Sequence, residues 1–146
     1  MSTGFGLRLA RSIAATAPAA VGIDPHLSRV PGVDMRDPVA AQAAAVRAFG
    51  LAVVEAVAGV VPVVKPQVAF FEQLGAPGVD ALADVVAAAR EAGLIVLLDA
   101  KRGDIGSTAE AYARATLDDD GPMGADAVTL NPYLGPESLA PFRDRA

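Results

Sequence analysis

Two lysines are the side chains of this sequence best suited to proton transfer. The chain has 146 residues, and of its twelve cationic side chains only Lys65 and Lys101 are lysines, the others being arginines. Arginine stays protonated in proteins, whereas a buried lysine can shift its pKa and give up a proton. Lys101 lies in the segment DAKRGD (99–104), in which acidic and basic side chains alternate. We therefore expect a charged cluster built around this lysine.

Polar residues also stand at the ends of four apolar runs, at 19–24, 60–65, 94–100 and 126–131. The residues are Asp24, Lys65, Asp99 with Lys101, and Asn131. In parallel α/β folds the carboxyl ends of the strands carry the chemistry. A single such residue could belong to a turn or reach into solvent, but four in succession indicate one shared edge.

The elements that would position these residues alternate between strand and helix. The four apolar runs are predicted strands, and because they are continuous they predict burial on both faces of a parallel sheet. Pro62 conflicts mildly with a central strand at 60–65. Asp37 is the predicted N-cap of a helix that runs from Pro38 to about Ala58. Further helices are predicted at 5–16, 79–92, 107–117 and from 136 to 142.

Composition and net charge exclude several classes of function. The apolar fraction is 53% with 5% aromatic residues, which predicts one domain, residues 1–146, with a core of Ala, Val and Leu. A net charge of -5 argues against general nucleic-acid binding. Without cysteine and with one histidine, a structural zinc site is not expected. No targeting or membrane-spanning segment is recognised, so a cytoplasmic location is expected.

Four segments together resemble orotidine 5′-phosphate decarboxylase, in the branch found in bacteria. They are LDAKRGDIGSTAEAYA (98–113), KPQVAFFEQLG (65–75), VGIDPHL (21–27) and TLNPYLG (129–135), and the resemblance covers essentially the whole chain. It implies a (β/α)8 TIM barrel and cofactor-free conversion of orotidine monophosphate (OMP) to UMP and carbon dioxide, within pyrimidine biosynthesis. It also implies a homodimer with shared active sites and no nucleic-acid or membrane partner.

The resemblance also assigns roles to residues. Lys101 would stabilise the carbanion at C6 of the pyrimidine and then protonate it. Asp99, expected to project from the same strand face as Lys101, would keep that lysine charged, and Lys65 would order the cluster. The resemblance extends this cluster to a catalytic network of four residues whose fourth member, Asp104, would reach into the partner subunit's site, and Ile105 and Thr108 would cross with it. Asp24 would bind ribose hydroxyls, and Asn131 would line the pocket.

Several alternatives stay open at this point. A complete barrel needs about 250 residues, so the four predicted units are expected to be the N-terminal half of one. A related magnesium-dependent barrel that acts on sugar phosphates, or a truncated inactive chain, are the other hypotheses. His26 is interpreted as a loop residue and Phe70 and Phe71 as residues that pack under the loop. Glu72 is interpreted as a brace of the second loop. Arg102, Glu110 and Tyr112 are interpreted as ordinary surface.

Overall fold

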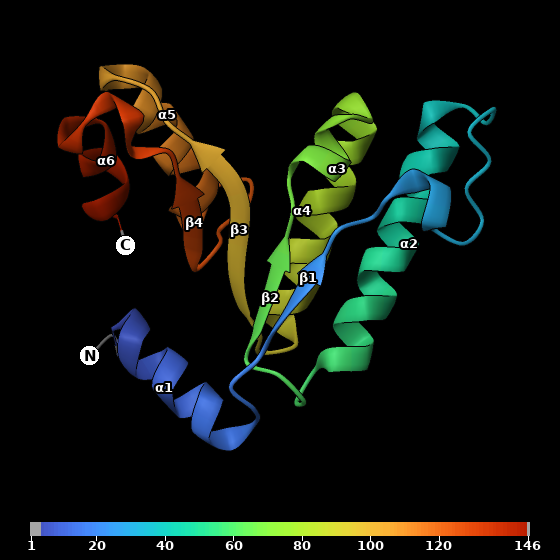
Figure 1. The fold of residues 1–146 in the computed structure, drawn as a ribbon, viewed down its shortest axis with the longest axis horizontal. Helices are drawn as coiled ribbons and strands as arrows, with labels where there is room; N and C mark the ends of the chain where they lie inside the picture. The colour runs from blue at the N-terminus through green and yellow to red at the C-terminus, as the bar shows by residue number, and fades with distance from the viewer. Residues whose placement is uncertain (1–3, 146) are drawn as a thin grey trace.

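Residues 4–145 are described by the computed structural model, and within them four strands form one parallel sheet (Figure 1). The strands are β1 (Ala20–Ile23), β2 (Val63–Pro66), β3 (Ile95–Arg102) and β4 (Ala127–Leu130). They lie in the sheet in the order in which they occur in the sequence. All three neighbouring pairs are parallel, which confirms the predicted α/β architecture.

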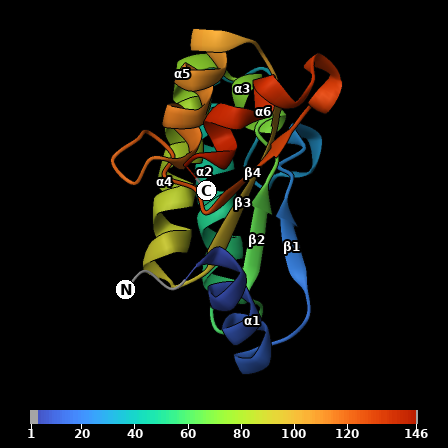
Figure 2. The same cartoon turned by 90° about the vertical axis from the view of Figure 1, so that its left-hand side faces the viewer.

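Helices separate the strands and cover one face of the sheet. They are α1 (Phe5–Ala15), α2 (Val39–Val57), α3 (Ala69–Glu72), α4 (Gly75–Glu91), α5 (Gly106–Leu117) and α6 (Pro136–Arg143), with short 3-10 turns η1 (Leu27–Arg29) and η2 (Pro132–Leu134). Figures 1 and 2 show α2 and α4 along the same side of the strands, while α1 lies at the strands' N-terminal end. The carboxyl ends of all four strands therefore lie at the edge of the sheet away from α1.

The core lies between the sheet and helices α2 and α4, and it consists of small aliphatic side chains, as the composition predicts. Val46 of α2 and Val85 of α4 are fully buried, together with Val64 and Val96 of the two central strands. Gly50 allows the two helices to approach closely, because a Cβ at that position would lie 2.6 Å from a methyl group of Val85. This packing fixes β2 and β3 firmly relative to each other.

The prediction that the strands are buried on both faces is wrong for β1, β2 and β4, and β2 shows the reason. Val64 and Pro66 are buried, whereas the alternate residues Val63 and Lys65 are only half-buried. Successive strand residues point to opposite faces, and within residues 4–145 the helices α2 and α4 cover only one of them. Lys65 consequently points to the uncovered face.

Two other local predictions need correction. Asp37 is not the N-cap of α2: Pro38 occupies that position, and the carbonyl of Asp37 instead accepts a hydrogen bond from the Gln42 side chain at 2.8 Å. The second strand begins at Val63, so Pro62 precedes it and does not interrupt it; the strand ends on another proline, Pro66. The Pro62 carbonyl accepts from the Ile95 amide at 2.9 Å and so begins the contact between β2 and β3.

Helix α2 is also long and apolar enough, by length and composition alone, to cross a membrane. Its buried aliphatic residues Ala43, Val46 and Val54 belong to the core that also contains residues of α4 and β1.

Candidate active site

The pairing of β2 with β3 brings residues from two segments of the sequence to one carboxylate. Val63 pairs with Ile95 and Val64 with Val96. Beyond the end of β2 the chain stays in contact with β3, because Gln67 forms an isolated bridge opposite Asp99. Two-residue alternation from Val63 then places Lys65 and Gln67 on the same side, next to Asp99.

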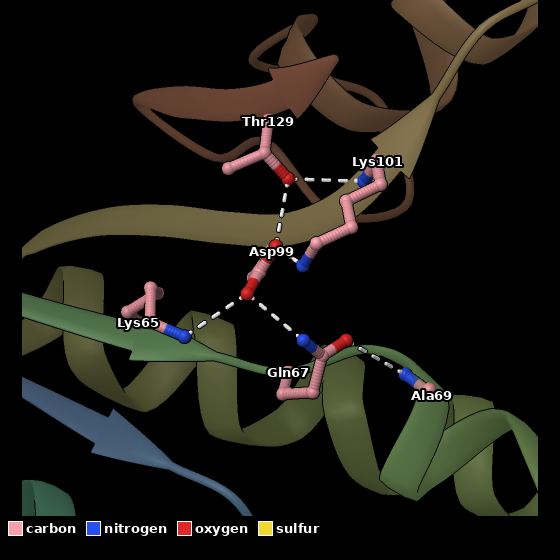
Figure 3. A network of polar contacts seen from close by, with 6 residues as sticks. All are labelled: Lys65, Gln67, Ala69, Asp99, Lys101 and Thr129. Atoms are coloured by element: carbon pink, nitrogen blue, oxygen red, sulfur yellow. Dashed lines mark hydrogen bonds and ion pairs between the residues drawn. The ribbon is translucent and has the colours of Figure 1, made fainter. Parts of the chain in front are cut away.

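Asp99 is the centre of this site and is only 7% exposed. One carboxylate oxygen, Oδ2, accepts from Lys65 Nζ at 3.0 Å and from Gln67 Nε2 at 2.8 Å. The other, Oδ1, accepts from Thr129 Oγ1 at 2.8 Å and from Lys101 Nζ. Figure 3 shows the four donors converging on Asp99 from β2, β3, β4 and the segment after β2. We call these five residues the Asp99 cluster.

The electrostatics of the Asp99 cluster favour a charged carboxylate. The Lys101 ammonium is the largest cause that holds the pKa of the Asp99 carboxyl well below its usual range; burial opposes it, and Lys65 and Thr129 add to the lowering. The cluster contains two ammonium groups and one carboxylate, so it carries one excess positive charge. Such a site attracts an anionic ligand and can stabilise negative charge that develops beside it.

Lys101 reaches Asp99 by a route that strand alternation does not predict. It is the non-glycine residue with a positive φ in residues 4–145, at 49°, and it lies where the pairing of β3 with β4 is irregular. Its amide donates to Thr129 Oγ1 at 3.0 Å. The expectation that Asp99 and Lys101 share a face of a regular strand is therefore wrong in its geometry, although the two side chains do meet. The Lys101 side chain is 64% exposed, so its ammonium remains accessible.

Asp104, Ile105 and Thr108 lie outside the Asp99 cluster. The Asp104 carboxylate accepts from the Ile105 amide at 2.8 Å, in its own turn, and the structure gives it no contact with either lysine. Within a single chain, Lys65, Asp99 and Lys101 of the predicted four-residue network are in contact, and Asp104 is not part of that contact. Ile105 is 66% exposed, and Thr108 lies one turn further along the exposed start of α5. Their crossing to a partner subunit stays a prediction.

Asp24 and Asn131 lie at the same edge of the sheet, after β1 and β4, and both are exposed. The Asn131 side chain accepts from the Tyr133 amide at 3.0 Å and so fixes η2. Gly103 allows this turn to approach β3, because a Cβ there would lie 2.9 Å from the Asn131 carbonyl oxygen. All four polar strand ends predicted from the sequence are therefore at one edge.

Sequence analysis missed Gln67 and Thr129 as members of the cluster. Both stand inside segments singled out by the resemblance, Gln67 two residues after Lys65 and Thr129 two residues before Asn131. Period-two alternation places each on the same side as its neighbour, but their contact with Asp99 depends on how the strands align.

Arg102 and Tyr112 make specific contacts at the surface. Arg102 forms an ion pair with Glu72 of α3, and its guanidinium carbon lies 5.2 Å from the centre of the Tyr112 ring. Glu72 thus braces the end of β3. Glu110 of α5 forms an ion pair with Arg145, which follows α6.

The loop after β1 is held by aromatic packing. The rings of His26 and Phe70 lie 4.3 Å apart, and Phe71 is fully buried, in agreement with a packing role for both phenylalanines.

A groove of about 1130 Å³ lies at the opposite end of the strands, between α1 and the starts of β3 and β4. Arg8, Leu94 and Asp126 are among its lining residues. Within residues 4–145 no three His, Asp or Glu side chains converge as a metal site requires.

Known proteins resemble this chain along nearly all of its length. A curated orotidine 5′-phosphate decarboxylase from Nocardioides sp. is 49% identical over 142 residues, which is 97% of this chain and 50% of that protein. The one from Rhodopirellula baltica is 51% identical over 131 residues, which is 84% of this chain and 43% of that protein. The chain thus spans about half the length of the curated relatives it matches.

Solved structures agree with these relatives. The crystal structure of a Streptomyces avermitilis protein, provisionally described as an orotidine 5′-phosphate decarboxylase, is 48% identical and superimposes with a TM-score of 0.89 over all of this chain and 50% of its own. OMP decarboxylase from Leishmania donovani is 35% identical, with a TM-score of 0.79 over 97% of this chain and 50% of its own. The four strand–helix units are therefore about half of a TIM barrel, which confirms the predicted fold class.

The sequence model of one family matches residues 30–146, which include every residue of the Asp99 cluster. Fold, sequence identity and this match agree, and the chain belongs to the orotidine 5′-phosphate decarboxylase / HUMPS family.

Proposed function

We propose that this chain supplies the proton donor of an orotidine 5′-phosphate decarboxylase, which converts OMP to UMP and carbon dioxide. The observation that carries the proposal is the Asp99 cluster, in which one buried carboxylate holds two lysines at the C-terminal edge of the sheet. The names of the relatives support this substrate over a sugar phosphate.

The geometry suits the chemistry of this decarboxylation. When the C6–carboxylate bond breaks, its electron pair stays on C6 and carbon dioxide leaves as a neutral molecule. The Lys101 ammonium stabilises that negative charge and then transfers a proton to C6, which leaves a neutral amine that water can reprotonate. Asp99 keeps Lys101 protonated before the reaction, and Lys65 holds Asp99 in place. No cofactor takes part in these steps.

The remaining roles belong to the same proposal. Asp24 binds the ribose hydroxyls and Asn131 lines the base pocket, since both extend the edge that carries Asp99. Asp104, Ile105 and Thr108 act in the site of a second subunit of a homodimer. The exposure of Ile105 and the separation of Asp104 from both lysines support this arrangement. The location proposed is the cytoplasm.

The test uses a chimera in which residues 1–146 are followed by the part of the Nocardioides relative that this chain does not match. We expect loss of orotidine absorbance when OMP is added, and no loss in the same chimera with Lys101→Ala. A folded chimera that leaves OMP unchanged but decarboxylates a keto-gulonate phosphate with magnesium would contradict the proposal and favour the sugar-phosphate alternative.

A further inference from the structure

The ladder between β3 and β4 contains an irregularity at the proposed proton donor. Leu98 pairs with Val128, and the next pair is Arg102 with Leu130. Between these pairs β3 advances four residues while β4 advances two. Asp99, Ala100 and Lys101 therefore stand opposite Thr129 alone, and a regular ladder cannot supply hydrogen-bond partners for all of them.

Thr129 supplies the missing partner with its side chain. The Lys101 amide can only donate, so in the contact of 3.0 Å the Thr129 hydroxyl oxygen is the acceptor. The hydroxyl's single proton is then free for Asp99 Oδ1, which lies 2.8 Å away. One hydroxyl thus joins the backbone of Lys101 to the carboxylate that its own ammonium binds (Figure 3).

The backbone of Lys101 needs such support. Its φ of 49° lies in the left-handed region, which a residue with a long side chain adopts only when its surroundings impose it. Gly103, two residues later, absorbs the close approach of the Asn131 turn, so the strand end is constrained from β4 on both sides of Arg102.

We propose that Thr129 is a positioning residue for the decarboxylation: its hydroxyl holds the Lys101 backbone and the Asp99 carboxylate in one arrangement, and so fixes where the Lys101 ammonium lies. The inference rests on the proposed function for its catalytic consequence only. The hydrogen bond by which Thr129 holds the Lys101 backbone can be tested without any substrate.

Three variants of the chimera test this inference. Thr129→Val keeps the branched shape and the strand preference but removes the hydroxyl, whereas Thr129→Ser restores the hydroxyl without the methyl group. Thr116→Val is the matched control, because Thr116 is a buried threonine whose hydroxyl bonds only to carbonyls of its own helix, α5. Hydrogen exchange at single-amide resolution and steady-state kinetics are measured on each variant. Thr129→Ala replaces the valine variant if circular dichroism shows that the latter does not fold.

In Thr129→Val we expect the Lys101 amide to exchange about tenfold faster, since its hydrogen bond is lost. We expect kcat to fall about 10- to 100-fold through misplacement of the ammonium, with KM nearly unchanged. Thr129→Ser should recover most of both quantities, and Thr116→Val should change neither.

Unchanged exchange at Lys101 in Thr129→Val would overturn the inference, as would a serine variant that behaves like the valine variant. A chimera with wild-type residues 1–146 that folds but does not decarboxylate OMP would instead overturn the proposed function. The exchange comparison would still decide whether Thr129 holds Lys101.

Discussion

Removing the charge of Asp99 should destabilise the fold as well as stop catalysis. Asp99→Asn keeps the shape of the side chain, but one oxygen that accepts two hydrogen bonds becomes an NH2 group that accepts none. If that group replaces Oδ2, the bonds from Lys65 and Gln67 are lost. If it replaces Oδ1, those from Lys101 and Thr129 are lost. Either way one lysine loses its hydrogen-bond acceptor, and both lysines lose the carboxylate charge.

The size of the effect follows from these contacts. A hydrogen bond to a charged group contributes about 1.5–3 kcal/mol to the free energy of unfolding, and a neutral one about 1 kcal/mol. The Lys65 and Lys101 side chains are 34% and 64% exposed, so water stabilises whichever ammonium is left alone and the larger cost of an enclosed ion does not apply. We therefore expect Asp99→Asn to lower the free energy of unfolding by about 3 kcal/mol.

Equilibrium urea unfolding of the chimera, followed by circular dichroism, measures this quantity. A double-mutant cycle with Lys65→Met shows whether the contacts cause it, because the loss in Asp99→Asn should be at least about 1 kcal/mol smaller when Lys65 is already absent. If the effects of Asp99→Asn and Lys65→Met on the free energy of unfolding add to within about 0.5 kcal/mol, the contact between the two residues is not the cause.

The difference in the free energy of unfolding between wild type and Asp99→Asn should also depend on pH. The pKa of Asp99 is lowered in the folded protein, chiefly by Lys101. A group of this kind contributes stability that is fully present above its unfolded pKa of about 3.9 and is lost as the pH falls towards the folded pKa. The difference between wild type and Asp99→Asn should be constant between about pH 5 and 8 and shrink below about pH 4.

Three further outcomes are expected. Lys101→Arg, which keeps the charge but cannot release the proton, should abolish OMP turnover in the chimera as fully as Lys101→Ala; near-normal kcat in Lys101→Arg would show that this position acts only as a charge. Exhaustive dialysis against EDTA should leave activity unchanged, and a loss that magnesium restores would favour the sugar-phosphate alternative. Mixed Lys101→Ala and Asp104→Ala proteins, each inactive, should regain partial activity once subunits exchange, and no recovery after confirmed exchange would place Asp104 in its own subunit's site.

The sequence predicted the parts of the fold and site that depend on local pattern. Apolar runs and their polar ends placed Asp24, Lys65, Asp99 and Asn131 at one edge, because parallel strands bring their carboxyl ends together. The predicted end of the helix at residue 92 lies one residue beyond the end of α4 at Glu91, and Gly93 just after it has the positive φ of 77° that a helix terminator adopts. These features depend on residues that are close together in the sequence.

The features that were missed depend on how distant strands align. The left-handed backbone of Lys101 and the role of Thr129 both follow from the register shift between β3 and β4, which no local pattern encodes. Gln67 joined the cluster because the chain continues along β3 after β2 ends. The N-cap of α2 is Pro38 and not its neighbour Asp37. Capping preferences alone do not decide between two adjacent residues.

The order of the strands in the sheet has a consequence for synthesis of the protein. Since neighbours in the sheet are also neighbours in sequence, each strand can pair with one that the ribosome has already released. The contact between Lys65 and Asp99 becomes available as soon as β3 emerges. Thr129 emerges almost thirty residues later than Lys101, so the backbone of Lys101 stays unrestrained until β4 docks. During translation the ion pair between Lys65 and Asp99 therefore forms before the contact that positions the Lys101 backbone.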